Sequence, residues 1–275
     1  MMTTMLNFVQ ITMLQKINKI AILFLLLIAT LSCNKSSNKN NTQIKNITKT
    51  VNHKKIQKTK NKKIVALTDK NIEKELLKYG KENKETLVLL KTKKGDMKIK
   101  LYTNTPLHRA NFIRLIKNDF YKGTMFYRVV NHFMIQGGDN DDWSRQSIKN
   151  KMGNYTIPAE FRKDNIHKKG AVSMAREYEN NPNKRSVSFE FFIVQGTKYT
   201  EGELLGAEQE YGIKISSKHK KIYQTVGGTP HLDGQHTVFG QVIEGLNVID
   251  SIAKVKVDDG DWPIEDIVIN LEILK

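Results

Sequence analysis

From residue 86 onward, the chain contains short segments in which apolar and polar residues alternate. Residues 86–92 and 96–102 are two such segments, separated by a Lys-Gly pair that is typical of a turn. In residues 132–136, Phe133 and Ile135 fall on one face and Met134 and Gln136 on the other, and the glycine pair at 137–138 is predicted to end this strand. Together with a strand over residues 126–130, this brings Arg128, Met134 and Gln136 to one surface. Residues 267–273 carry isoleucine or leucine at every second position. Because side chains on a strand point alternately to its two faces, these segments predict half-buried β-strands.

The segment after residue 104 has the pattern of a helix. A threonine hydroxyl can cap the first turn of a helix, and proline is tolerated at its first position, so Thr105 and Pro106 predict its start. Phe112, Leu115 and Ile116 then fall on one face. We therefore expect a helix whose apolar face packs on the strands.

Four further segments have weaker patterns. Residues 245–253 predict a second helix, and residues 69–84 a short one. Residues 198–225 are rich in lysine and glutamate and predict an insertion that is helical in part. Residues 140–154 are polar and predict an irregular loop, and His108, within the first helix, is interpreted as a surface histidine.

The positive charge of the chain is concentrated near its N-terminus. The formal net charge is +17, which by itself would suggest nucleic acid as a partner. Residues 1–68 hold twelve lysines and no acidic residue, so removing these twelve charges leaves +5 for residues 69–275. Residues 34–68 are rich in Asn, Lys, Ser and Thr and have no aromatic residue, a composition that predicts a disordered tether. Nucleic acid is therefore not expected as a partner.

The first 33 residues resemble a bacterial lipoprotein signal. Two lysines precede an apolar run over residues 20–30, which is shorter than the roughly 20 residues of a membrane-spanning helix. A Leu-Ser-Cys sequence follows and ends at Cys33, the only cysteine of the chain. We expect cleavage before Cys33, lipidation of Cys33 and a place in the cell envelope, on the periplasmic side or the outer surface. Ordinary signal cleavage, with Cys33 as a spare thiol, stays open.

Residues 126–139 read FYRVVNHFMIQGGD and closely resemble the signature of the cyclophilin family of peptidyl-prolyl isomerases. Later segments match further family motifs in the same order: GAVSMAR at 170–176 and HLDGQHTVFG at 231–240. The chain departs from the usual pattern at Tyr127, where histidine is usual, and at Ser188, Phe189 and Glu190, which replace glycine, serine and glutamine. Glu190 brings a carboxylate toward the substrate groove, where pairing with Arg128 and exposure to solvent are both open.

The resemblance covers residues 86–274 and implies an all-β fold, a closed eight-stranded antiparallel β-barrel capped by two α-helices. Periodicity alone predicts only a β-rich chain whose closure is uncertain. We therefore expect three parts: a signal peptide over residues 1–32, a basic tether over residues 33–84 that includes the possible short helix, and an isomerase domain over residues 85–275.

The reaction implied by the resemblance is rotation about X-Pro peptide bonds in proline-containing polypeptides, with a role in the folding of exported or envelope proteins. The barrier to this rotation is near 20 kcal/mol, and no bond is broken, so we expect no cofactor and no metal. The resemblance implies a catalytic role for Arg128, Phe133 and Gln136. The residues it implies for substrate binding are Met134, Ala175, Arg176, Glu190, Phe192, His231, Leu232 and His236.

Other functions stay possible on the sequence alone. Tyr127 and Glu190 are the best support for a non-catalytic module that binds proline peptides. A basic protein that binds nucleic acid or envelope polymers through residues 34–68 is a second alternative. His231 and His236 have a spacing that could suggest metal, but a third ligand is not evident nearby. A membrane-tethered monomer is the default expectation for the assembly.

Overall fold

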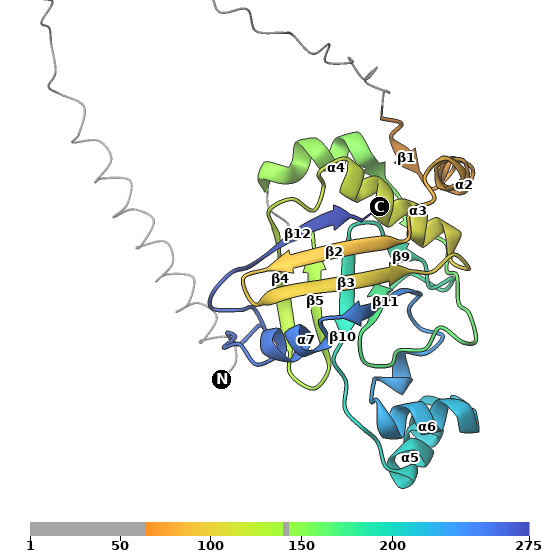
Figure 1. Ribbon diagram of the computed structural model, residues 1–275. Coiled ribbons are helices and arrows are strands. Elements are labelled where there is room, and N and C mark those ends of the chain that lie inside the picture. Colours follow the sequence, from red (N-terminus) through yellow and green to blue (C-terminus); the bar gives the residue numbers. More distant parts are fainter. Residues whose placement is uncertain (1–63, 140–142, 275) are drawn as a thin grey trace, which may run out of the picture. The chain divides into compact units, whose positions relative to one another are not determined.

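The alternating segments of the sequence form a closed antiparallel β-barrel in the computed structural model, which describes residues 64–139 and 143–274. The strands follow one another around the barrel in the order β10-β5-β4-β12-β2-β3-β11-β8, and β8 pairs with β10 to close it (Figure 1). The barrel strands are β2 (Leu87–Thr92), β3 (Gly95–Leu101), β4 (Thr124–Val130), β5 (Met134–Gly138), β8 (Ala171–Met174), β10 (Glu190–Val194), β11 (Val238–Glu244) and β12 (Ile267–Ile273). The predicted fold class is confirmed.

Closure of the barrel depends on its last strand. β12 pairs with β4 on one side and with β2, the first strand of the barrel, on the other. Its alternating residues Ile267 and Ile269 are fully buried, as their spacing predicted. The end of the chain therefore joins the two β-hairpins that come first in the sequence.

Two helices contact different parts of the barrel: α3 (Pro106–Lys117) packs on β11 and β12, and α7 (Leu246–Ala253) packs on β3, β4 and β5. Both were predicted. The cap of α3 differs from the prediction, because the Thr105 side chain makes no capping hydrogen bond. The Glu160 carboxylate caps the helix instead and accepts from the backbone N–H groups of Leu107 at 3.1 Å and His108 at 3.0 Å.

The interpretation of His108 as a surface residue is wrong. Its side chain is fully buried, and Nδ1 lies 2.8 Å from a Glu160 carboxylate oxygen while Nε2 lies 3.0 Å from the Ser186 hydroxyl. Almost every residue of α3 is buried, because the helix packs on the barrel and is itself covered by α2 (Ile72–Glu82). A buried polar ring needs partners, and Glu160 and Ser186 supply them.

Residues 64–84, which precede the predicted domain boundary at 85, belong to the same compact unit as the barrel. The predicted short helix is present as α2, which packs against α3. The preceding strand β1 (Leu67–Thr68) pairs in parallel with β6 (Gly153–Asn154), and the buried Arg114 guanidinium donates to the carbonyl of Val65 at 2.7 Å. The signal peptide, Cys33 and most of the tether lie outside the described residues.

The loop predicted over residues 140–154 is in part helical. It contains the short helices η1 (Trp143–Arg145) and α4 (Gln146–Met152). Met152, at the end of α4, is buried in the main core and anchors this helix. The remaining short strands are β7 (Thr156–Ile157) and β9 (Ser186–Val187), which pair with each other.

The insertion at 198–225 folds into two helices, α5 (Glu201–Tyr211) and α6 (Ser217–Thr225), as predicted in part. Both lie apart from the barrel strands in Figure 1 and precede the short helix η2 (Pro230–Leu232). They enclose a small core of their own, formed by Ile166, Leu204, Ile215 and Tyr223.

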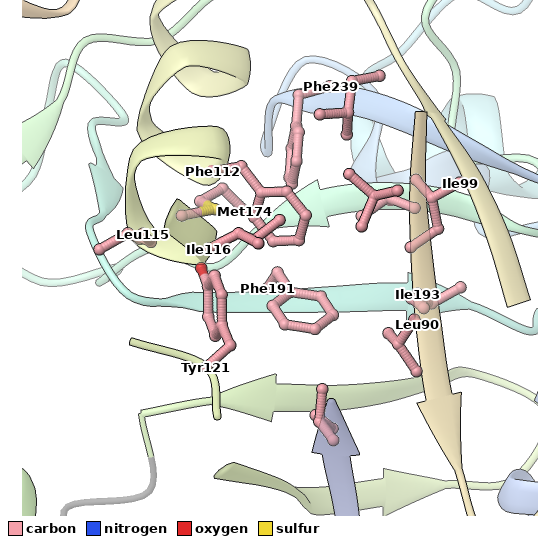
Figure 2. Packing of buried hydrophobic residues seen from close by; sticks show 14 of the residues in the cluster. Leu90, Ile99, Phe112, Leu115, Ile116, Tyr121, Met174, Phe191, Ile193 and Phe239 are labelled. Carbon is pink, nitrogen blue, oxygen red and sulfur yellow. The ribbon is translucent and has the colours of Figure 1, made fainter. Parts of the chain in front are cut away.

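The main core fills the barrel and is centred on Phe191 of β10. Figure 2 shows the ring of Phe191 beneath that of Phe112 and beside Tyr121. The ring centroids of Phe191 and Phe112 are 5.4 Å apart in an edge-to-face arrangement, and those of Phe191 and Tyr121 are 5.5 Å apart. The barrel is therefore a packed core, and space for a substrate has to lie on its outside.

Candidate active site

The site begins where β4 and β5 lie side by side. Arg128 and Gln136 are directly opposite each other, so the two side chains share a surface as the sequence predicted. The register shifts between Phe126 and Arg128, which makes Tyr127 an extra residue in β4. Such a bulge re-aims side chains, and both Tyr127 and Arg128 reach the surroundings of Gln136 although neighbours on a regular strand point to opposite faces.

The glycine pair does not end β5 as predicted but continues it. Gly137 and Gly138 are both paired with β4 and β10. A Cβ atom at Gly137 would lie 2.7 Å from Cδ1 of Ile269 in the core, and one at Gly138 would lie 2.2 Å from the carbonyl oxygen of Phe189. The two glycines are therefore required for close packing of the strands beneath the site.

A cavity of about 270 Å³ lies against this surface. Ten of the eleven residues predicted for catalysis or substrate binding line it, and the exception, His231, stacks on the ring of Phe133 at 5.7 Å. Phe133 itself precedes β5, in the turn before Met134, and so faces the cavity although strict alternation would turn it away. The lining residues are Arg128, Phe133, Met134, Gln136, Ala175, Arg176, Glu177, Tyr178, Val187, Glu190, Phe192, Leu232 and His236.

One end of the cavity is apolar and is built around Phe192. The His236 ring meets Phe192 edge-on at 5.3 Å, and the buried ring of His167 stacks on Phe192 at 6.0 Å. Burial lowers the pKa of His236 to about 4, so the ring is neutral at pH 7. Its Nδ1–H therefore donates to the carbonyl of Met174 at 3.1 Å, and Nε2 accepts from the hydroxyl of Tyr178 at 2.8 Å.

The other end of the cavity is polar, and Glu190 lies within it. The Tyr127 hydroxyl donates to the Glu190 carboxylate at 2.5 Å, and burial, with the nearby negative charge of Glu190, raises the pKa of Tyr127. Because that proton is engaged, the 2.6 Å contact between Tyr127 and Gln136 requires the Gln136 amide N–H to donate. A second contact from the same nitrogen reaches Glu190 at 3.2 Å. The amide oxygen of Gln136 is thereby presented as an acceptor.

Arg128 is positioned by Asp261, a residue that lies outside the signature segment. Its Nε donates to the carboxylate of Asp261 at 3.3 Å, and the backbone N–H of the next residue, Val129, donates to the Asp261 carbonyl at 2.9 Å. Within residues 64–139 and 143–274, Nη1 and Nη2 of Arg128 have no hydrogen-bond partner. The terminal nitrogens are therefore available to a ligand while Nε fixes the plane of the guanidinium.

Sequence reasoning missed several residues of this site, of which Asp261, Tyr178 and His167 contact its functional side chains. Asp261 precedes the last strand, and a lone acidic residue in a polar loop carries no local signal. Tyr178 follows a recognised motif by two residues but lies in a loop without periodicity. His167 is fully buried beneath Phe192 and was not singled out, although a histidine three residues before the GAVSMAR motif could have suggested it.

The model of the cyclophilin type peptidyl-prolyl cis-trans isomerase family matches residues 87–272. The chain belongs to the cyclophilin family. It is 37% identical over 199 residues to a putative peptidyl-prolyl cis-trans isomerase of Staphylococcus saprophyticus, which covers 70% of this chain and 93% of that relative. A putative peptidyl-prolyl cis-trans isomerase of Staphylococcus aureus is 37% identical over 191 residues, covering 67% of this chain and 89% of the relative.

A solved cyclophilin type isomerase of Cryptosporidium parvum has the same fold. It superposes with a TM-score of 0.50 at 22% identity and covers 70% of this chain and 98% of its own. The family match and the similarity to the staphylococcal relatives identify the protein as a cyclophilin-type peptidyl-prolyl cis-trans isomerase. The family assignment favours an enzyme over the non-catalytic module that the changes at Tyr127 and Glu190 had suggested.

Proposed function

We propose that the cavity beside β4 and β5 is the isomerase active site, with Arg128 as its principal catalytic residue. The observation that carries this proposal is the pairing of Arg128 with Gln136 across two strands, at the border between a polar and an apolar end of one cavity. Phe133, Met134, Phe192, Leu232 and His236 supply the apolar end, which suits a proline ring.

The proposed mechanism needs only binding and polarisation. When an X-Pro amide twists, its nitrogen regains a lone pair and becomes an acceptor, so a donor that reaches it stabilises the twisted form over both planar forms. An Nη–H of Arg128 is that donor. The Gln136 amide oxygen accepts from a substrate backbone N–H and holds the chain on one side of the proline, while the apolar end holds the ring.

The assay is cis/trans exchange in an Ala-Pro test peptide, measured by NMR with the wild-type chain, Arg128→Ala and Arg128→Lys. We expect both variants to lose about 100-fold in catalysis, since one preorganised donor is worth that much and an ammonium lacks the planar fork of the guanidinium. Arg162→Ala, at an arginine outside the cavity, is the control and should keep its activity. Full activity in a folded Arg128→Ala chain would refute the assignment.

We also propose that the enzyme is exported and anchored by a lipid on Cys33, where it assists folding of exported or envelope proteins. Support comes from the short apolar run at 20–30, from the single cysteine directly after it, and from the acid-free lysine-rich segment that follows. Among residues 64–139 and 143–274, no helix is long and apolar enough to cross a membrane.

Labelling with a radioactive fatty acid in a bacterial host tests the anchor. The wild-type chain should take up label and fractionate with membranes, and Cys33→Ser should do neither. Label retained by Cys33→Ser would contradict the proposal. The folding role is tested separately, by the refolding rate of an exported protein whose slow phase is proline isomerisation: the wild-type chain should accelerate it and Arg128→Ala should not.

A further inference from the structure

The inserted helices α5 and α6 are fastened to the rim of the active-site cavity. The Tyr223 hydroxyl of α6 donates to the Asp233 carboxylate at 2.6 Å, and the neighbouring residue Leu232 lines the cavity. Leu204 of α5 is fully buried in the small core shared with Tyr223. The start of α5 is fixed by a capping box between Thr200 and Glu203. The insertion is therefore a rigid part of the cavity rim.

This support places Tyr211 beside the site. Tyr211 is the last residue of α5, and the left-handed backbone of Gly212, with φ of +62°, ends the helix directly after it. The Tyr211 ring lies 5.3 Å from the ring of His231, and His231 lies 5.7 Å from Phe133, which lines the cavity. Three rings thus run without a break from the active site to the end of the insertion.

The outer end of this row is open to solvent. Tyr211 is 48% exposed. Burial lowers the pKa of His231, so the His231 ring is neutral at pH 7 and adds no charge to this row of rings. An exposed tyrosine at the end of a supported helix, continuous with an apolar binding site, offers a face on which another ring can stack. Backbone carbonyls and carboxylates would gain little from such a surface, because the face of an aromatic ring carries partial negative charge.

We propose that Tyr211 and His231 bind an aromatic side chain of the substrate, within about three residues of the isomerised proline. The distance limit follows from the two ring spacings, since an extended chain advances roughly 3.4 Å per residue. This inference rests on the proposed active site. It makes the insertion a specificity element that favours aromatic residues beside proline.

The test measures kcat/KM by NMR exchange with the full chain. The substrates are an alanine-flanked Ala-Pro peptide as reference and variants with phenylalanine at each of the three positions on either side. For at least one position, phenylalanine should raise kcat/KM about threefold to tenfold, the gain of one aromatic pair. Tyr211→Ala should abolish that gain and leave the reference peptide unchanged, while Tyr211→Phe should keep the gain because the ring is retained.

Leu205→Ala is the matched control, because Leu205 lies on the same helix and is also 48% exposed. It should keep the gain from phenylalanine. A gain that survives Tyr211→Ala, a gain lost equally in both variants, or no gain at any position would overturn the inference while leaving the proposed active site standing. Failure of the wild-type chain to catalyse even the reference peptide would overturn both.

Discussion

Tyr223 and Tyr121 are both fully buried, but only the Tyr223 hydroxyl has a hydrogen-bond partner among the described residues. Replacing each by phenylalanine should therefore change the free energy of unfolding by different amounts. The Tyr223 hydroxyl donates to one oxygen of the Asp233 carboxylate, while the other oxygen accepts from the backbone N–H and the ring Nδ1–H of His167. Burial, with the negative charge of Asp233, raises the pKa of Tyr223, so the hydroxyl stays protonated. The Tyr121 hydroxyl is buried and has no hydrogen-bond partner among the described residues.

The cost of Tyr223→Phe follows from the charge on its partner. A hydrogen bond to an ionised group contributes about 1.5–3 kcal/mol. The Asp233 side chain is 25% exposed, so water can replace part of the lost bond, and we expect the lower part of that range, about 1.5–2 kcal/mol. Tyr121→Phe removes a hydroxyl that gains nothing from the protein, and the free energy of unfolding should change by less than about 0.5 kcal/mol or increase.

Urea unfolding, followed by tryptophan fluorescence, measures the change in the free energy of unfolding for both variants. With a slope near 2 kcal/mol per M, Tyr223→Phe should lower the midpoint by about 0.7–1 M, and Tyr121→Phe should not lower it measurably. Equal losses in the two variants would refute the reasoning, because burial of the ring and not the bond to Asp233 would then decide the cost.

Three further predictions concern the site. Asp261→Gly should leave stability nearly unchanged, because the ion pair with Arg128 is about 40% exposed and glycine tolerates the φ of +64°. Its kcat/KM should nevertheless fall about fivefold. Asp261→Asn still offers an acceptor and should lose less activity, and equal losses in the two variants would count against a positioning role. Glu190→Gln removes a negative charge from the cavity. It should therefore raise the ratio of kcat/KM for peptides with an acidic residue beside proline to kcat/KM for peptides with lysine there. If that ratio does not change, the carboxylate does not act on the substrate. Burial lowers the pKa of His236 from 6.5 to about 4 in the folded state, so the unfolded chain takes up the proton first as the pH falls. The contribution of His236 to stability is therefore complete above pH 6.5, and up to about 3 kcal/mol of it is lost as the pH falls to 4. His236→Gln should flatten that part of the stability–pH curve, and an identical slope would contradict the assignment.

The strands were predictable because their signal is local. Residues 86–92, 96–102 and 267–273 needed only the alternation of side chains to be placed on half-buried strands, and the structure has β2, β3 and β12 there. The same holds for α7, which occupies the predicted residues after its first glycine. Closure into a barrel was implied by the family resemblance and not by the pattern, since pairing of β12 with β2 joins residues far apart in the chain.

The errors have a common cause. His108 was taken for a surface residue because nothing near it in the sequence shows that α2 covers the helix or that Glu160, 52 residues away, supplies a buried partner. The glycines of β5 were read as a strand end, whereas Ile269 and Phe189 leave no room there for a side chain. In each case the deciding neighbour is distant in sequence.

By itself, the sequence determined where five of the barrel strands and the two capping helices lie, which family the chain resembles, and which residues gather at the cavity. These features depend on short-range periodicity or on motifs matched residue by residue. Only the tertiary structure decided that Asp261 orients Arg128, that Glu190 accepts a hydrogen bond from the Tyr127 hydroxyl, and that Tyr211 extends the row of rings from Phe133. Those contacts join residues 63 to 133 positions apart or pass from an insertion to the barrel, so closure and packing of the fold had to bring them together first.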